Sequence, residues 1–312
     1  MINATAESQL EAGAPRRSRS FRGRRVVAAT VALASVFALG LHAFADQGPD
    51  RQLARLLARA GEQVRRFEQS FAAVLSDEDY EQHATGRFFI GPQHRRTRAE
   101  MLFLWLPNEA TWLTVRSVLN VDGKAVAGSR HRLNDALDGP GAERLPRLRQ
   151  LVNESARCNV GRTFRNFNYP TLVLSYLDPS MQTRFAFSLA GRERVRGSDT
   201  WKVNFVERST PTVIQGDGTD RLSRGTVWIA DGEAVLVRTR LEVKIPKPES
   251  SAWATLEVDY QRNATLDMWV PAEMRETYME MRGSSVDENI GGKATYSNFR
   301  RFETSARVLP PR

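Results

Sequence analysis

The spacing of apolar residues changes along the chain, and the first pattern is helical. Over 49–78 the apolar residues recur every three or four positions, at Leu53, Leu56, Leu57, Val64, Phe67, Phe71, Val74 and Leu75. Charged residues lie between them, at Arg51, Arg55, Arg59, Glu62, Arg65, Arg66 and Glu68. A single apolar stripe at this spacing predicts one amphipathic helix over 49–78, which packs its stripe against another part of the fold.

From Thr85 onward the apolar residues tend to alternate with polar ones, which predicts β-strands. The run over 101–106 is apolar at successive positions, so we expect a strand that is covered on both faces. Asp122-Gly123 and Asp231-Gly232 are strong hairpin signals. The other expected strands lie at 171–177, 183–189, 201–207, 225–230, 234–245, 253–261, 269–281 and 293–302.

Between 134 and 160 the alternation breaks. Pro140, Gly141 and Pro146 indicate a loop, and the leucines after it indicate a short helix that runs toward Cys158. An irregular link over 161–170 follows, and the whole middle stretch could cross over the sheet or cover it.

These elements predict an α+β fold. An N-terminal helix packs on a large antiparallel sheet of about ten strands, and short connections between consecutive strands favour antiparallel neighbours. We expect the sheet to curve into an unclosed barrel with a helical insert. The sequence shows no repeat and no strong linker, so we expect a single domain over 46–307 and a disordered tail over 308–312.

The first 45 residues have the pattern of an export signal. Six arginines between positions 16 and 25 precede an apolar run over 26–41. Ala43-Phe44-Ala45 follows this run closely. A basic stretch, an apolar segment and a small-x-small site predict a signal peptide over 1–45 that is cleaved after Ala45. The alternative is a membrane anchor over 26–45. Cleavage would place the mature chain in the periplasm or outside the cell.

Charge and cysteine content narrow the classes of partner. The full chain carries a formal charge of +9. The first 45 residues supply +4 of this, from six arginines against Glu7 and Glu11, and no block of five or six like charges follows them. This scattered charge argues against a nucleic-acid partner, but it allows attraction to anionic lipid headgroups. The sequence does not indicate the oligomeric state. Cys158 is the single cysteine, so no internal disulfide is expected. It is either a small buried residue or a reactive thiol.

Residues for known chemistry are sparse. Beyond the predicted signal peptide the chain has three histidines, His83, His94 and His131, and although the first two could meet across strands, no metal-ligand spacing is present. We therefore expect neither a metal nor a cofactor. The sequence also lacks a Gly-x-Ser-x-Gly elbow and a phosphate-binding Gly-rich loop. Glu273, Glu276 and Glu280 indicate a solvated sheet face.

Aromatic residues on the expected strands are the most distinctive feature of the mature chain. They belong either to an ordinary core beneath the first helix or to the lining of a concave sheet that binds an apolar ligand. The candidate lining residues are Phe103, Trp105, Trp112, Phe185, Phe187, Trp201, Phe205, Trp228, Tyr260 and Tyr278.

Two stretches resemble known proteins. Gly225-Thr226-Val227-Trp228-Ile229 with Asp231-Gly232 resembles a hairpin of the lipoprotein-carrier class, the half-barrels of the LolA, LolB and RseB type. This resemblance implies an unclosed barrel with an apolar hollow for acyl chains. The run over 296–302 is similar to the closing run of a group of exported bacterial proteins with no assigned activity.

The leading hypothesis is an exported, non-enzymatic protein that binds a lipid or an acylated protein in its half-barrel. One alternative is a hydrolase of cell-envelope polymer that uses an unrecognised acid pair. Another is an envelope scaffold that binds protein partners through exposed sheet edges.

Overall fold

The computed structural model describes residues 47–71, 73–106, 111–138, 141–163, 165, 167–216, 218–247 and 249–302. The predicted signal peptide over 1–45, its cleavage site and the predicted tail over 308–312 lie outside these residues. Pro49–Arg312 forms one compact unit. None of the helices in the described part of the chain is long and apolar enough to cross a membrane.

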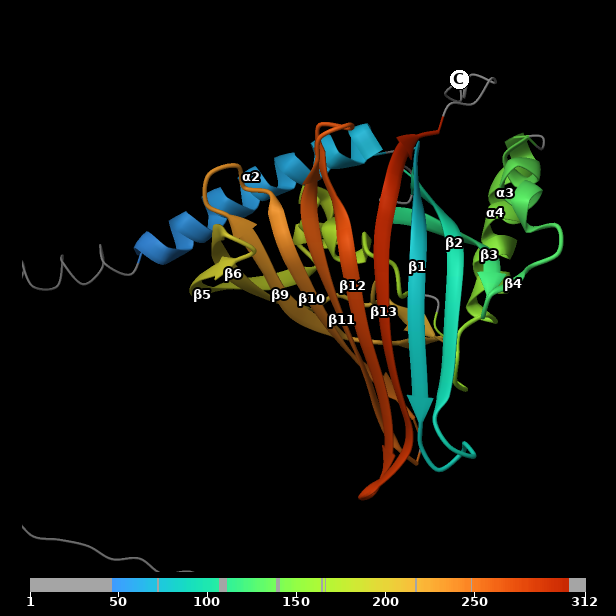
Figure 1. Cartoon of the computed structure of the whole chain (residues 1–312). Coiled ribbons are helices and arrows are strands. Elements are labelled where there is room, and N and C mark those ends of the chain that lie inside the picture. Colours follow the sequence, from blue (N-terminus) through green and yellow to red (C-terminus); the bar gives the residue numbers. More distant parts are fainter. Residues whose placement is uncertain are drawn as a thin grey trace, which may run out of the picture. The chain divides into compact units, whose positions relative to one another are not determined.

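An antiparallel sheet of eleven strands dominates this unit (Figure 1). Its strand order is β4-β3-β2-β1-β13-β12-β11-β10-β9-β6-β5, so the sheet ends at β4 and β5 and does not close. The strands are β1 Ala73–Thr85, β2 Gln93–Leu106, β3 Thr111–Val121, β4 Lys124–Ala125, β5 Phe185–Val195, β6 Ser198–Glu207, β9 Ser223–Ala230, β10 Leu236–Pro246, β11 Ser251–Asn263, β12 Met268–Arg282 and β13 Ser285–Arg301. A separate short ribbon joins β7 Gln215–Gly216 to β8 Thr219–Asp220. The predicted α+β unclosed barrel is confirmed.

Helix α2, Gln47–Phe71, lies across one end of the sheet (Figure 1). Its stripe of Leu56, Ala60, Val64 and Phe71 is buried in the main core. The predicted helix over 49–78 was therefore too long, because the chain turns into strand β1 after Phe71.

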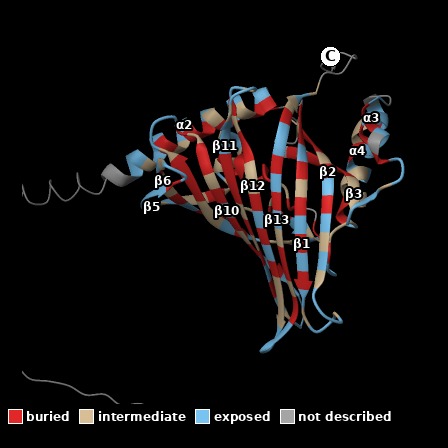
Figure 2. Ribbon diagram, viewed as in Figure 1, coloured by how far each residue is buried: buried red, intermediate tan, exposed pale blue. Residues whose placement is uncertain are grey.

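Strand β1 lies between β2 and β13 near the middle of the sheet. Its inward residues are not all apolar, since Ser76, Glu78 and Gln82 are buried alongside Val74 and Tyr80. Buried and exposed residues alternate along much of β1 (Figure 2). Apolar and polar residues do not alternate in this strand, because several of its buried residues are polar. This is why the pattern of apolar residues missed the strand.

The segment around 172–177 packs on the concave side of the sheet. The predicted strand over 171–177 is wrong, because Leu172–Leu177 forms a 3-10 helix, η1, in which all six residues are buried. A short apolar run that is buried on every side carries no strand or helix period, so its spacing gave no reliable signal. The one-turn helix α5, Pro179–Gln182, follows directly.

The middle stretch forms two helices, α3 Ser129–Asp138 and α4 Gly141–Ala156, where a loop and one short helix were expected. Leu133 and Leu148 pack with Leu102 and Val115 in a second core beside the main one. Met101 and Phe103 belong to the main core, so the strand around Leu102 is covered on both faces as predicted.

Candidate functional site

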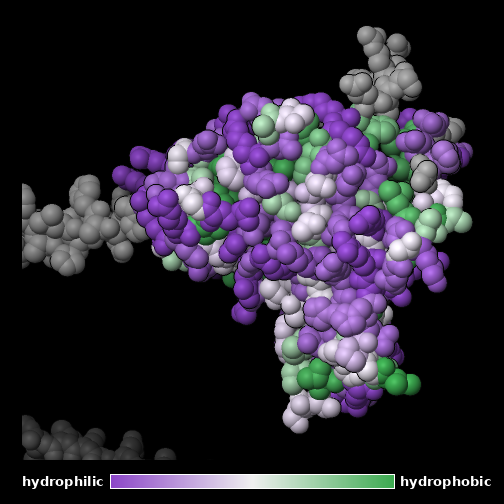
Figure 3. Space-filling model, in the orientation of Figure 1, coloured by the Kyte–Doolittle hydropathy of each residue, from purple (hydrophilic) through white to green (hydrophobic). Residues whose placement is uncertain are grey.

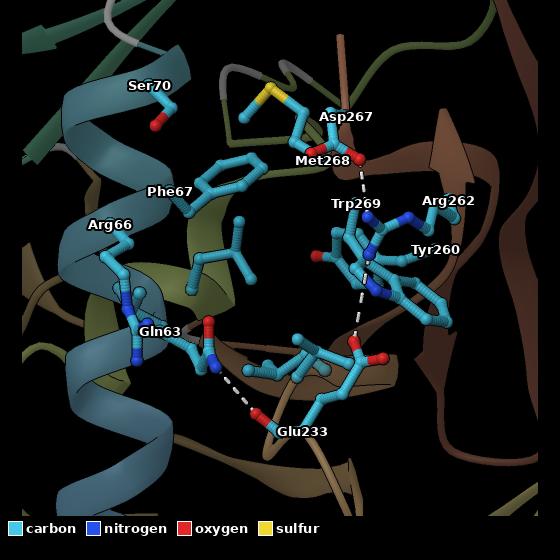
Figure 4. A pocket seen from close by; sticks show the side chains of 14 residues that line it. Gln63, Arg66, Phe67, Ser70, Glu233, Tyr260, Arg262, Asp267, Met268 and Trp269 are labelled. Atoms are coloured by element: carbon cyan, nitrogen blue, oxygen red, sulfur yellow. Dashed lines mark hydrogen bonds and ion pairs between the residues drawn. The ribbon is translucent and has the colours of Figure 1, made fainter. Parts of the chain in front are cut away.

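A pocket of about 260 Å³ lies between α2 and the neighbouring ends of β10, β11 and β12 (Figure 4). Helix α2 forms one wall, and η1 contributes Leu174. The residues that line it are Gln63, Val64, Arg66, Phe67, Ser70, Leu174, Glu233, Val235, Leu236, Tyr260, Arg262, Asp267, Met268 and Trp269.

The lining is apolar where the pocket meets the core. Val64, Leu174 and Leu236 are buried, and Phe67 packs partly buried against the same core. The Tyr260 hydroxyl donates to the carbonyl of Pro170 at 2.6 Å, which satisfies its polar end and leaves the ring as pocket wall. The pocket can therefore accept an apolar group without burying an unpaired hydroxyl.

One polar atom of the lining is unsatisfied. The Trp269 indole Nε1 is buried and has no hydrogen-bond partner within the described part of the chain. A buried donor without a partner costs free energy, and because this nitrogen is closed to solvent it offers no hydrogen bond to a molecule in the pocket.

Polar contacts form the rim of the pocket and join α2 to the β9–β10 turn. Gln63 Nε2 donates to the Glu233 carbonyl at 2.7 Å, and Arg59 donates to the Gly232 carbonyl. Arg262 pairs with Asp267 at 2.5 Å and lies 3.9 Å from Glu233 (Figure 4). An apolar interior with a charged rim suits an amphiphile whose polar end stays in solvent.

Of the ten aromatic residues predicted to line a hollow, Tyr260 lines this pocket. Phe103, Trp112, Phe185, Phe205 and Tyr278 are buried in the main core, and Trp105, Phe187 and Trp201 pack partly buried against it. The ligand-lining role of these residues stays a prediction.

Trp228 lies apart from the main core. It is buried beside Val195 and Val237 in a third small cluster, whereas its strand neighbours Val227 and Ile229 belong to the main core. Its Nε1 donates to Glu193 at 2.9 Å. In the strand alternation Trp228 therefore occupies the face opposite to the one that forms the core.

Several pocket residues were not singled out from sequence. The sequence predicts Val64 and Phe67 on the apolar stripe of the first helix and Trp269 at the start of a strand, but no pattern indicates that they lie close together. The pocket exists because the β11–β12 turn brings Met268 and Trp269 beside α2, and that proximity has no local sequence signal.

A second cluster of polar residues lies inside the core and is closed to solvent. Arg165 Nη1 lies 2.9 Å from Glu276 Oε1, and both side chains are completely buried. Tyr80 donates to Glu276, and Arg165 also donates to Gln82 at 2.6 Å. The interpretation of Glu276 as part of a solvated sheet face is therefore wrong.

The electrostatics of this cluster fit a structural role. Burial, and next the Glu276 carboxylate, raise the pKa of Tyr80 and of Tyr278 well above the usual value. Arg116 makes a similar buried pair with Glu78, at 2.6 Å between Nε and Oε2. These groups bind the segment around 165 to the sheet, and their burial leaves no access for a polymer chain.

His83 and His94 are cross-strand partners on β1 and β2, as predicted, and both are exposed. Within the described residues, no group of three or more potential metal ligands comes together.

No protein-family model and no curated protein matches the sequence. Among solved structures, a DUF1329 family protein from Desulfovibrio piger ATCC 29098 is similar at a TM-score of 0.37 and 12% identity, covering 78% of this chain and 92% of that chain. A domain named for outer membrane lipoprotein sorting, from Vibrio parahaemolyticus, is similar at a TM-score of 0.35 and 12% identity, covering 80% and 95%. Lipovitellin, in a structure of its lipid–protein interactions, is similar at a TM-score of 0.30 and 7% identity, covering 75% of this chain and 26% of that chain.

These likenesses concern the fold alone.

Proposed function

We propose that this chain is an exported, non-enzymatic protein that binds an acyl chain of a lipid or of a lipid-modified partner. The binding site is the pocket between α2 and the ends of β10, β11 and β12. The predicted signal peptide over 1–45 supports a periplasmic or secreted location.

The observation that carries this proposal is the composition of the pocket. Its inner wall consists of Val64, Phe67, Leu174, Leu236 and Met268, and its charged residues lie at the rim. Transfer of an alkyl chain from water to such a wall is favourable by about 25 cal/mol per Å² of apolar surface.

The size of the pocket limits what enters it. A cavity of about 150 Å³ holds benzene, with its six carbons. By the same ratio, the 260 Å³ of this pocket hold about ten carbons. The site therefore fits a single alkyl chain, or the end of a longer one, and not a bundle of chains.

Displacement of a fluorescent fatty acid tests the proposal. We expect the chain from Asp46 onward to bind the probe and to release it when decanoate is added. Val235→Trp fills the pocket from its half-buried edge and should weaken binding at least about tenfold, because the bulky ring takes the ligand's space.

Val286→Trp is the matched control, since Val286 is 38% exposed at the opposite end of β12 and β13. It should bind the probe like the parent chain. Equal binding by the parent and by Val235→Trp would contradict the proposed site.

A further inference from the structure

The turn between β1 and β2 exposes large apolar side chains at the end of the sheet opposite α2 (Figure 1). Ile90 is 103% exposed and Phe88 is 45% exposed. Figure 3 shows hydrophobic side chains gathered at this lower end of the molecule. Val286, in the adjoining β12–β13 hairpin, is also exposed.

The turn is held in place by specific contacts. Arg87 Nε lies 2.6 Å from Asp287 Oδ1, whose side chain is fully buried. The Phe88 ring has the Arg162 guanidinium at 4.2 Å from its centroid and the Arg87 guanidinium at 4.9 Å. Gly86 is required by close approach, because a Cβ there would lie 2.4 Å from the Asp287 carbonyl oxygen. These contacts fix the turn and leave Ile90 in solvent.

The charges around the turn favour an anionic surface. The stretch 82–99 contains no aspartate or glutamate, and Arg87 lies in the turn itself, while the Arg162 guanidinium lies over the Phe88 ring. Arg95, Arg96 and Arg98 lie further along β2, where Asp122, Asp79 and Glu81 pair with them. Arg87 and Arg282 are 46% and 43% exposed, while Asp287, the carboxylate that they share, is buried. Arg87 and Arg282 therefore reach solvent whereas Asp287 does not, and Arg282 also pairs with Glu249, which is 74% exposed.

We propose that residues 86–92 form a membrane-contact element, which places Phe88 and Ile90 in the headgroup region of an anionic bilayer. An aliphatic tip with an aromatic ring and flanking arginines has the composition of interfacial anchors. The tip is convex, and a fluid bilayer accepts such a shape without a complementary groove.

This element stands apart from the lipid pocket and does not rest on it. Strand β12 runs from Met268 at the pocket to Arg282 near the tip. Fifteen residues at about 3.3 Å each separate the two sites by roughly 50 Å. A chain docked by this turn would hold its pocket away from the bilayer surface.

Vesicle flotation tests the proposal. The protein is the chain from Asp46 onward, which contains the compact unit Pro49–Arg312 and lacks the apolar run over 26–41. We expect it to float with vesicles of phosphatidylethanolamine and phosphatidylglycerol, and to float less with phosphatidylcholine alone or in high salt.

Ile90→Asp should lower the partition coefficient about tenfold or more, because a charged side chain opposes insertion. Ile90→Leu should keep it. Leu222→Asp is the matched control, since Leu222 is 56% exposed but lies outside the turn. Its partition coefficient should stay within about twofold of the parent's.

Unchanged flotation of Ile90→Asp, or no flotation of the parent, would overturn the proposal. If the parent chain floats with neither kind of vesicle but captures an envelope protein, the turn is a protein contact. That result also overturns the membrane-contact proposal. Val235→Trp should float like the parent, so failure of the pocket and failure of the turn are distinguishable.

Discussion

Arg165 and Glu276 form an ion pair, 2.9 Å from Nη1 to Oε1, in which neither side chain reaches solvent. The pair joins the irregular segment on the concave side to strand β12. We expect Arg165→Met to destabilise the fold by about 3–5 kcal/mol, because it leaves the Glu276 carboxylate buried and unpaired. Urea unfolding of the parent and the variant measures this.

The matched control is Arg192→Met, whose ion pair with Asp231 is on the surface, at 57% and 47% exposure. It should cost less than about 1 kcal/mol. The double variant Arg165→Met, Glu276→Leu should recover part of the loss. A cost at Arg165 as small as that at Arg192 would contradict the structural role of the buried pair.

The buried Glu68 carboxyl should make the stability of the fold depend on pH. Burial, followed by the nearby Asp178 carboxylate, raises the pKa of Glu68 from 4.5 to about 8, while Arg65 acts to lower it. Between these two pH values the folded state holds a proton that the unfolded state has lost, so stability should fall as the pH rises from 4.5 to 8.

Glu68→Gln should remove this loss and stabilise the protein at pH 8 by an amount on the order of 2 kcal/mol. Thermal or urea unfolding across the pH range checks it. Glu62→Gln, on the exposed side of the same helix, should leave the slope unchanged. A Glu68→Gln profile with the parent's slope would show that another group is responsible.

Gly225, the first residue of the Gly-Thr-Val-Trp-Ile run, is required by close packing. A Cβ there would lie 1.9 Å from the Arg240 carbonyl oxygen and 2.7 Å from the Phe205 ring. Gly225→Ala should therefore cost about 1–3 kcal/mol in the free energy of unfolding.

Gly232→Ala is the matched control for Gly225, because no atom lies within 4 Å of its added Cβ. We expect it to change stability by less than about 0.5 kcal/mol. If both alanine variants unfold at the same urea concentration, the proposed steric conflict at Gly225 is absent.

Cys158 should react slowly as a thiol. The side chain is half-buried, and burial raises its pKa above the usual value, so less thiolate is present near neutral pH. The initial rate with a thiol-specific dye should be about tenfold lower in the folded chain than in urea. Equal rates would point to an accessible, activated thiol.

Much of the fold could be predicted because most strands alternate. The β9–β10 hairpin at Asp231-Gly232 and the doubly covered strand around Leu102 follow from short-range patterns. Strand β1 does not, because its buried residues Glu78 and Gln82 are polar. Their partners Arg116 and Arg165 lie far along the chain, where no local pattern indicates them.

The site was harder to predict than the fold. Ten aromatic residues suggested a wide hollow, but η1 and the core side chains occupy most of the concave face. What remains open depends on where α2 crosses the β11–β12 turn. The position of that crossing depends on contacts between segments far apart in the sequence. Of the ten aromatic candidates, Tyr260 is the one that lines the pocket.

Native mass spectrometry tests the central claim most directly. The delipidated chain from Asp46 onward would be incubated with membrane extract and then transferred to the gas phase intact. We predict an adduct with the mass of one acyl-chain lipid on the parent and on Val286→Trp, and its loss from Val235→Trp. Absence of any lipid adduct on the parent, or the same adduct on Val235→Trp, would contradict the account.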